Sequence, residues 1–545
     1  MRLIIKDYLL QLKEKDELDL LICDILLQMG YITDNQPKTG NRQFGVDVRA
    51  HNDEELLLFV IKQGDLTRKV WDADQNAVRQ SLDEIHDSYL NYINGADRNK
   101  KLRVIVATNG MIDEATRPNW EGYKARNTNW NGMQVEIDFW NIDTLTEYVQ
   151  KYLFDEHIFD AEMQVLMRRA LYFIGERDYR KEYYEQIVEM LISQLNDKDS
   201  AKLRKKKLCS VHLACQMIAT YAEEAGFFKI GIMVSEYLII KYWKYIMTNN
   251  LFEKSAYIEW LIKYLSAYEK WNQKYYEAVR YCCAGANRLP FSNPVEQKVI
   301  LFEVLGYLIT YAYYLSCMPK YDQYSYEKCQ EVMANIIQLI NNYPQFLYPP
   351  FDIHISIVSM LYRLLDKLGR CKDINTLIYN QCGHLMQYYH MYKKYPSPID
   401  TFEDAVNIHM GFPAEDYLTS VFWGTMLEWI VLMNQQKTYD ILRDFLSKDL
   451  VGVTKCTWFL KATEEVEIYD NYAMNRAGEG VDFEIERSFD EVKDNISFIM
   501  KQYEKETFSF ETYSFDALEF IICRYYGYLP RVKREHSEQI DVKLD

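Results

Sequence analysis

The chain has 545 residues, more than the roughly 250 to 300 at which a single hydrophobic core stops growing, so we expect at least two domains. Hydrophobic residues make up 48% of the chain and charged residues 26%, a globular composition that excludes a largely disordered protein. The net charge of −17 excludes a nucleic-acid surface that covers the whole chain, because phosphate binding depends on clustered lysine and arginine. A local binding groove remains compatible with it.

Individual residue counts narrow the class of protein further. The 21 glycines and 12 prolines are few for this length, which favours long helices over an all-β fold with many turns. The 45 tyrosines are many, and they fit either a helical core or an interaction surface. The 11 cysteines lack zinc-ligand spacing, and we expect them to be reduced and mostly buried in a cytoplasmic protein. Charge breaks the N-terminal apolar run too early for a secretory signal.

The first part of the chain alternates helix and strand patterns. Apolar residues at helical spacing predict a helix over Glu17 to Met29, with Gly30 as its stop. Strands are predicted over Phe44 to Ala50 and Leu56 to Gln63, joined by a polar hairpin connection. The remaining predicted elements are a helix over Ala73 to Ile93, a strand over Leu102 to Thr108, a helix over Asp113 to Arg126, a strand over Met133 to Trp140 and a helix over Asp143 to Phe154. This order predicts an α/β domain with a small central sheet flanked by helices, over residues 1–158.

Beyond residue 158 the strand signals stop, and helix follows helix to near Tyr526. We therefore predict an all-α region over 159–528, with the character of a solenoid but no clean repeat, and a loose polar tail over 529–545. The most apolar stretches, Val299 to Met318 and Tyr417 to Met433, each contain a glutamate. We interpret both as buried helices of a large α domain rather than membrane spans.

One carboxylate and one lysine lie at the ends of the two strands of the predicted hairpin. Asp47 follows Gly45, where a small residue lets a phosphate or another backbone approach, and the apolar run from Leu56 ends on Lys62. On a strand, Val60 and Lys62 share a face. Phosphodiester hydrolysis needs an activated water and compensation of the charge that builds on the phosphate. Magnesium supplies both, and it takes oxygen ligands such as carboxylates.

Taken in order, these elements resemble the PD-(D/E)xK nuclease superfamily, and its Mrr-like restriction endonucleases most closely. In those proteins a helix carries a glutamate, a Gly-x-Asp strand supplies the main metal ligand, and the next strand carries Glu-x-Lys or Gln-x-Lys. Here the matching segments are the helix from Glu17, Gly45-Val46-Asp47 and Val60-Ile61-Lys62. The resemblance covers about residues 10 to 155 and implies a restriction-endonuclease-like fold with an Mg²⁺ (or Mn²⁺) cofactor.

The resemblance also implies roles for individual residues. Asp47 would be the metal ligand and a catalytic residue, Lys62 would position the water or steady the phosphate charge, and Glu17 would be the helix glutamate. Val60 departs from the pattern, because valine cannot bind a cation where the family has Glu or Gln. The groups that could take over its role are Gln63, Asp65, Glu17 and Gln43. Otherwise the site has lost its activity.

Basic residues near this site are candidates for DNA contact. Arg68, Lys69 and Arg79 are close to it in sequence, and such side chains bind phosphates, although Arg79 also fits a simple helix-surface charge. The basic run from Lys202 to Lys207 is interpreted as a solvated helix face, since nothing else there marks a binding groove.

The sequence therefore predicts a magnesium-dependent DNA endonuclease. Fusion of an Mrr-like domain to a large helical region resembles prokaryotic anti-phage defence proteins, in which the helical region senses a signal or binds a protein partner. The alternative is a degenerate nuclease fold that serves as a protein-interaction scaffold or as the DNA-binding subunit of a defence complex. A homodimer is compatible with either function, because double-strand cleavage needs two sites.

Overall fold

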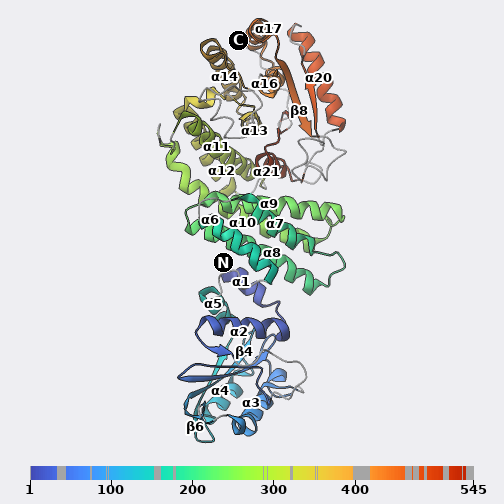
Figure 1. The fold of residues 1–545 in the computed structure, drawn as a ribbon. Helices are drawn as coiled ribbons and strands as arrows, with labels where there is room; N and C mark the ends of the chain where they lie inside the picture. Colours follow the sequence, from blue (N-terminus) through green and yellow to red (C-terminus); the bar gives the residue numbers. More distant parts are fainter. Residues whose placement is uncertain are drawn as a thin grey trace. The chain divides into compact units, whose positions relative to one another are not determined.

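The structure is a computed structural model. It describes residues 2–33, 44–73, 76–93, 95, 97–152, 161–175, 180–285, 288–290, 293–318, 323–349, 351–352, 354–396, 418–460, 469, 478–483, 488–506, 515–530 and 532–534. The chain folds into two compact units, Met1–Val234 and Ser235–Asp545 (Figure 1). Each unit is described by itself.

A six-stranded mixed sheet is the centre of the first unit. Its strands lie in the order β1-β2-β3-β4-β6-β5. β1, β2 and β3 pair antiparallel, β3, β4 and β6 pair parallel, and β5 returns antiparallel to β6. The strands are β1 (Ile32–Thr33), β2 (Val48–His51), β3 (Glu55–Lys62), β4 (Lys101–Thr108), β5 (Asn129–Trp130) and β6 (Met133–Trp140). The predicted α/β domain with a small central sheet is confirmed.

Helices cover both faces of this sheet because its central strands are apolar on both sides. On one face, Leu58 and Val60 of β3 belong to a buried cluster with residues of α3 (Val78–Asp87) and α4 (Arg117–Arg126). On the other face, the Phe59 ring contacts the Trp140 ring at 4.9 Å, and Trp140 contacts Tyr148 of α5 (Ile142–Tyr152). The helix α2 (Asp19–Gln28) lies on the face opposite α4 (Figure 1). The predicted helix over Ala73 to Ile93 is shorter in the structure, where a 3-10 turn follows α3.

Three further helices complete the first unit. They are α6 (Ala161–Gly175), α7 (Lys181–Ser193) and α8 (Ala201–Glu224). They pack on one another, and the N-terminal helix α1 (Arg2–Leu9) packs on both α5 and α8. The predicted domain boundary at residue 158 falls in 153–160, outside the described residues. The compact unit itself extends to Val234, so α8 belongs with the sheet.

The second unit is mostly helical. Its helices are α9 (Phe228–Thr248), which begins in the first unit, α10 (Ser255–Cys283), α11 (Pro294–Ser316), α12 (Gln323–Asn342), α13 (His354–Lys367), α14 (Cys371–Tyr392), α16 (Val421–Leu432), α17 (Gln436–Asp449), α20 (Phe489–Glu506) and α21 (Ala517–Tyr526). Several neighbours along the chain pack together, as in a solenoid, among them α11 with α12 and α13 with α14, but α21 returns to pack on α11 and α13. A 2.7 Å ion pair between the fully buried Arg363 of α13 and Glu519 of α21 stabilises this packing.

The predicted all-α region is wrong in one part, because the second unit also contains a three-stranded sheet. It consists of β7 (Thr419–Ser420), β8 (Thr454–Leu460) and β9 (Gly478–Asp482), in the order β7-β8-β9. α16 packs closely on β8, and a side chain at Gly424 would overlap the backbone of Cys456. The glycine therefore allows this close approach.

Other expectations have clear outcomes in the second unit. α11 is long and apolar enough to cross a membrane, but 78% of its most apolar window is buried, as in the core helix of a globular domain. Many tyrosines lie in the core, among them Tyr264, Tyr268, Tyr311 and Tyr313. All 11 cysteines are free thiols. Most of the predicted tail over 529–545 lies outside the described residues, and in its described part Arg534 Nε donates a 2.8 Å hydrogen bond to Asp366 Oδ1.

Candidate functional site

Asp47 lies where β2 approaches the C-terminal end of β3. Its N–H donates to the Phe59 carbonyl at 2.8 Å, and its Oδ2 accepts a 2.7 Å hydrogen bond from the Ile61 N–H. Burial raises the pKa of the Asp47 carboxyl, and this effect outweighs the Ile61 hydrogen bond and the charge of Lys62, which lower it. The nearby Glu14 also raises this pKa. The carboxylate is thus partly shielded from water and has a cationic neighbour.

Lys62, the last residue of β3, pairs with Glu14 rather than with Glu17. The Lys62 Nζ is 3.3 Å from Glu14 Oε1, and the two side chains are 14% and 30% exposed. Glu14 begins a single π-helical turn, Glu14–Leu18, that precedes α2 and packs against β3. Such turns re-aim side chains and are frequent at functional sites. The structure therefore brings Asp47, Lys62 and Glu14 together.

Glu17, the predicted helix glutamate, points to a different partner. Its Oε1 accepts a 2.5 Å hydrogen bond from Lys206 Nζ of α8, and its Oε2 accepts one of 2.8 Å from the Lys13 N–H. Sequence reasoning missed Glu14 because the helix was expected to begin at Glu17. An acidic residue three positions earlier, in the run Glu14-Lys15-Asp16-Glu17, was the available signal.

Two amide side chains at the end of the sheet form hydrogen bonds with the segment that contains Glu14. Gln63 Nε2 donates to the Leu12 carbonyl at 2.9 Å. Asn109, just after β4, donates from Nδ2 to the Leu9 and Leu12 carbonyls at 2.8 and 2.9 Å. Gln63 was predicted as a catalytic group, and in the structure its amide nitrogen is used for this attachment. Its amide oxygen remains available to another partner.

Asp65, another group considered as a replacement for Val60, has its partner outside the site. Asp65 Oδ1 accepts the Met111 N–H at 2.8 Å and joins the loops that follow β3 and β4. Gln43 lies outside the described residues. Val60 itself is 0% exposed and belongs to the apolar cluster that faces α3.

Gly45 makes room for another segment of the backbone. It has a φ of +80°, and a side chain there would overlap the Ser81 backbone of α3. Only glycine adopts this conformation readily and also fits this close contact. Of the two roles expected for Gly45, the structure gives the approach of a neighbouring backbone.

The basic residues predicted to contact DNA lie on the surface of the first unit. Arg68 and Lys69 are exposed between β3 and α3. Arg79 Nη1 is 3.4 Å from Asp72 Oδ2, and its Nε is 3.9 Å from Asp83 Oδ2, so its charge is shared with two carboxylates of the same surface.

The residues at the site fit a magnesium ion held with few protein ligands. Oδ2 of Asp47 is engaged by the Ile61 N–H, which leaves Oδ1, and Glu14 contributes a second carboxylate. Magnesium is usually bound through one or two carboxylates with waters completing the shell. Within the described part of the chain, no three His, Cys, Asp or Glu residues are grouped so that they could hold a metal ion. Asp47 and Glu14 are the two carboxylates that the structure places near Lys62.

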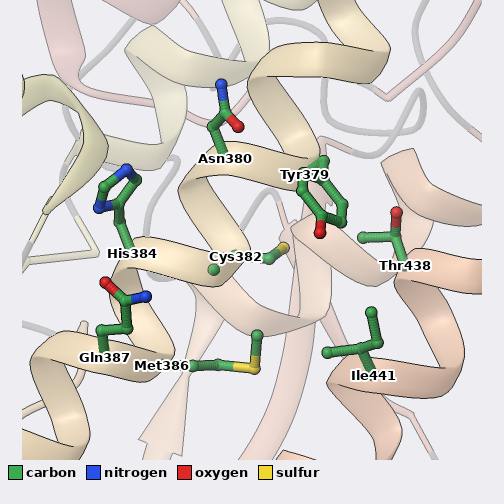
Figure 2. Close-up of a pocket in the computed structure, with 9 residues that line it drawn as sticks. Tyr379, Asn380, Cys382, His384, Met386, Gln387, Thr438 and Ile441 are labelled. Atoms are coloured by element: carbon green, nitrogen blue, oxygen red, sulfur yellow. The ribbon is translucent and has the colours of Figure 1, made fainter.

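A separate pocket lies in the second unit between α14 and α17, with a cavity volume of about 210 Å³. Thr438 and Ile441 of α17 face Tyr379 and Met386 of α14 across it (Figure 2). Its remaining lining residues are Asn380, Cys382, Gly383, His384 and Gln387. The lining holds no carboxylate, lysine or arginine, so it lacks the charged groups that bind magnesium and phosphate. None of the predicted site residues lines it.

Comparison of the chain with protein-family models, with curated proteins and with solved structures finds no match.

Proposed function

We propose that the first unit is a metal-dependent DNA endonuclease that hydrolyses phosphodiester bonds. One observation carries the proposal: Asp47, Glu14 and Lys62 converge at the C-terminal end of β3. Two carboxylates and an amine in one half-buried place suit a divalent cation and a phosphate. Open α/β sheets also place their ligands at the carboxyl ends of parallel strands, which is where Lys62 lies.

The order of the elements supports a PD-(D/E)xK, restriction-endonuclease-like fold for this unit. A helical segment with a glutamate, the strand next to Asp47, the strand ending on Lys62, a helix and a further core strand follow one another as the resemblance implies. Glu14 takes the place that the resemblance gave to Glu17.

Each residue has a distinct role in this proposal. Asp47 and Glu14 hold Mg²⁺ or Mn²⁺, which when bound polarises the phosphate and provides a water of lowered pKa. Lys62 places a positive charge where negative charge builds on the phosphate oxygens. The exposed Arg68 and Lys69 contact the DNA backbone, together with Arg79 once it exchanges its carboxylate partners for phosphates.

We further propose that the protein is a cytoplasmic anti-phage effector of prokaryotes whose helical region controls the nuclease or binds a protein partner. This role rests on the resemblance of the domain combination. Double-strand cleavage needs two sites, so we expect a homodimer to be the active form.

A second candidate function is favoured by a specific observation. Val60 is fully buried in the core. Asp47, Lys62 and Gln63 each form a hydrogen bond or an ion pair within the protein. A site of this kind also suits a degenerate nuclease fold that binds DNA or a protein without cleaving.

One set of variants tests both functions. The purified chain, with its oligomeric state determined by light scattering, is incubated with supercoiled and linear DNA and Mg²⁺ or Mn²⁺. We expect cleavage in the wild type and a loss of about 100-fold or more in Asp47→Asn and Glu14→Gln. Lys62→Met should lose about as much. Asp53→Asn is the matched control, because Asp53 is exposed in the turn between β2 and β3.

The outcomes separate the two functions. Cleavage that survives Asp47→Asn and Lys62→Met would exclude the proposed site. DNA binding by the wild type without cleavage under any divalent ion, measured by fluorescence anisotropy, would favour the degenerate fold.

A further inference from the structure

The short turn Glu14–Leu18, which carries Glu14, is held from two sides. On the sheet side, Gln63 and Asn109 bind the carbonyls of Leu12 and Leu9 just before the turn. From α8, Lys206 binds Glu17 within the turn. Glu14 therefore takes its position from a segment fixed at both ends.

Both oxygens of the Glu17 carboxylate accept hydrogen bonds. Oε2 accepts the Lys13 N–H at 2.8 Å, which closes the start of the turn, and Oε1 accepts Lys206 Nζ at 2.5 Å. Burial alone would raise the pKa of Glu17, but the hydrogen bonds from Lys206 and from the Lys13 N–H, with the lysine charges, outweigh it and lower this pKa. The Glu17 and Lys206 side chains are 20% and 26% exposed, so the pair is better shielded than a typical surface ion pair.

Lys206 is itself well fixed within α8. The next residue, Lys207, is bound by Asp199 Oδ2 at 2.7 Å and by the Gln194 carbonyl at 2.6 Å, and Ser200 caps the start of the helix. α8 also packs on α1, α6 and α7. A displacement of α8 therefore carries Lys206 with it.

We propose that Lys206 of α8 is a positioning residue that sets Glu14 at the candidate site through Glu17. The inference rests on the proposed nuclease function and adds a residue that positions one of its metal ligands. Residues that orient metal ligands commonly change metal affinity or activity about 10-fold to 100-fold when they are removed.

Five variants separate positioning from simple stabilisation. Lys206→Met removes the donor, Glu17→Gln keeps an acceptor for the Lys13 N–H but removes the charge, and their combination completes a double-mutant cycle. Lys206→Arg keeps charge and donor and is the conservative rescue. Lys205→Met, an exposed neighbour on the same helix, is the matched control.

The first measurement is hydrogen exchange of the amides of residues 13–18 in the full chain. We expect faster exchange in Lys206→Met and Glu17→Gln, wild-type exchange in Lys205→Met, and near wild-type exchange in Lys206→Arg. Unchanged exchange in Lys206→Met would overturn the proposal, whatever the activity of the protein.

The second measurement is the affinity for Mn²⁺ by calorimetry at a temperature where every variant is folded. We expect affinity to fall about 10-fold in Lys206→Met, with no further loss in the double variant. A lower melting temperature with unchanged Mn²⁺ affinity would reduce Lys206 to a stabilising residue and overturn the proposal. The nuclease function fails if the wild type does not bind Mn²⁺, or if Asp47→Asn leaves Mn²⁺ binding unchanged. In that case the exchange measurement still tests the attachment of the turn to α8.

Discussion

The Asp47 carboxylate accepts a 2.7 Å hydrogen bond from the backbone N–H of Ile61, on the neighbouring strand. This bond ties the acidic residue of the candidate site to β3, one residue before Lys62. Burial nevertheless raises the Asp47 pKa, so the ionised form that would bind a cation is disfavoured by the fold. Such a site lowers the folding stability of the protein and in return provides a group that can take part in chemistry.

Asp47→Asn should therefore stabilise the protein while it removes function. Because the folded pKa is raised, the contribution of Asp47 to stability is fully present below its unfolded pKa and is lost as pH rises through the folded value. Asparagine avoids that loss at neutral pH and keeps an oxygen for the Ile61 N–H. We expect the free energy of unfolding at pH 7 to rise by about 0.5 to 2 kcal/mol in urea titrations. Asp53→Asn should change it by less than about 0.5 kcal/mol, and a destabilised Asp47→Asn would contradict the argument.

Val60→Gln tests whether the family's ligand can be restored. The Val60 side chain is fully buried among apolar groups, so an amide in its place would lose hydrogen bonds to water. We expect a loss of about 1 to 3 kcal/mol in the free energy of unfolding and no gain in Mn²⁺ affinity. A tighter Mn²⁺ site in this variant would instead show that the longer side chain reaches Asp47 and that the wild-type site has lost a ligand.

β3 and β4 could be predicted from the sequence because each contains a continuous run of apolar residues. β3 and β4 were predicted to within one residue at each end, since buried parallel strands have few polar interruptions. β6 was predicted without error from the alternation of polar and apolar residues along it. β2 was predicted too long at its start, because Phe44 and Gly45 both have positive φ angles and cannot continue a strand. Lys62 could be predicted as the end of β3 because the apolar run stops there.

Other parts of the site depend on interactions that no local pattern records. Glu14 replaces Glu17 because a π-helical turn, rather than a regular helix, precedes α2. Lys206 lies 189 residues from Glu17 in the sequence, and its basic neighbours suggested only a solvated helix face. In the second unit, β9 was missed because its sequence, Gly-Glu-Gly-Val-Asp, has little strand preference outside its pairing with β8.

Gly110→Ala should disturb the loops that support the site. A side chain at Gly110 would overlap the backbone of Gly64 and Asp65, just after Lys62, and backbone atoms cannot move aside as a side chain can. We expect a loss of about 1 to 3 kcal/mol in the free energy of unfolding and weaker Mn²⁺ binding. Gly122→Ala is the matched control, since Gly122 lies inside α4 with open space around it, and it should stabilise by about 0.5 to 1 kcal/mol. Equal effects of the two substitutions would show that the loops after β3 and β4 are not in close contact.

Glu428 of α16 should make the stability of the second unit fall with rising pH. Burial raises its pKa to about 8, against the weaker opposing effect of the 2.7 Å hydrogen bond that Thr457 Oγ1 donates to it. A raised pKa means that the stability is fully present below the unfolded value, near 4.5, and is lost progressively as pH rises to about 8.

Glu428→Gln should remove this part of the pH dependence. Hydrogen exchange of the α16 amides between pH 5 and pH 9, corrected for the intrinsic exchange rate, reports the opening free energy at each pH. We expect the wild type to lose protection toward high pH by an amount on the order of a few kcal/mol, and the variant to lose less. Glu259→Gln, at an exposed position of α10, should follow the wild type. Because buried Asp352 also titrates, at a pKa of about 7, a residual slope is expected in the variant, and only an undiminished slope would contradict the role of Glu428.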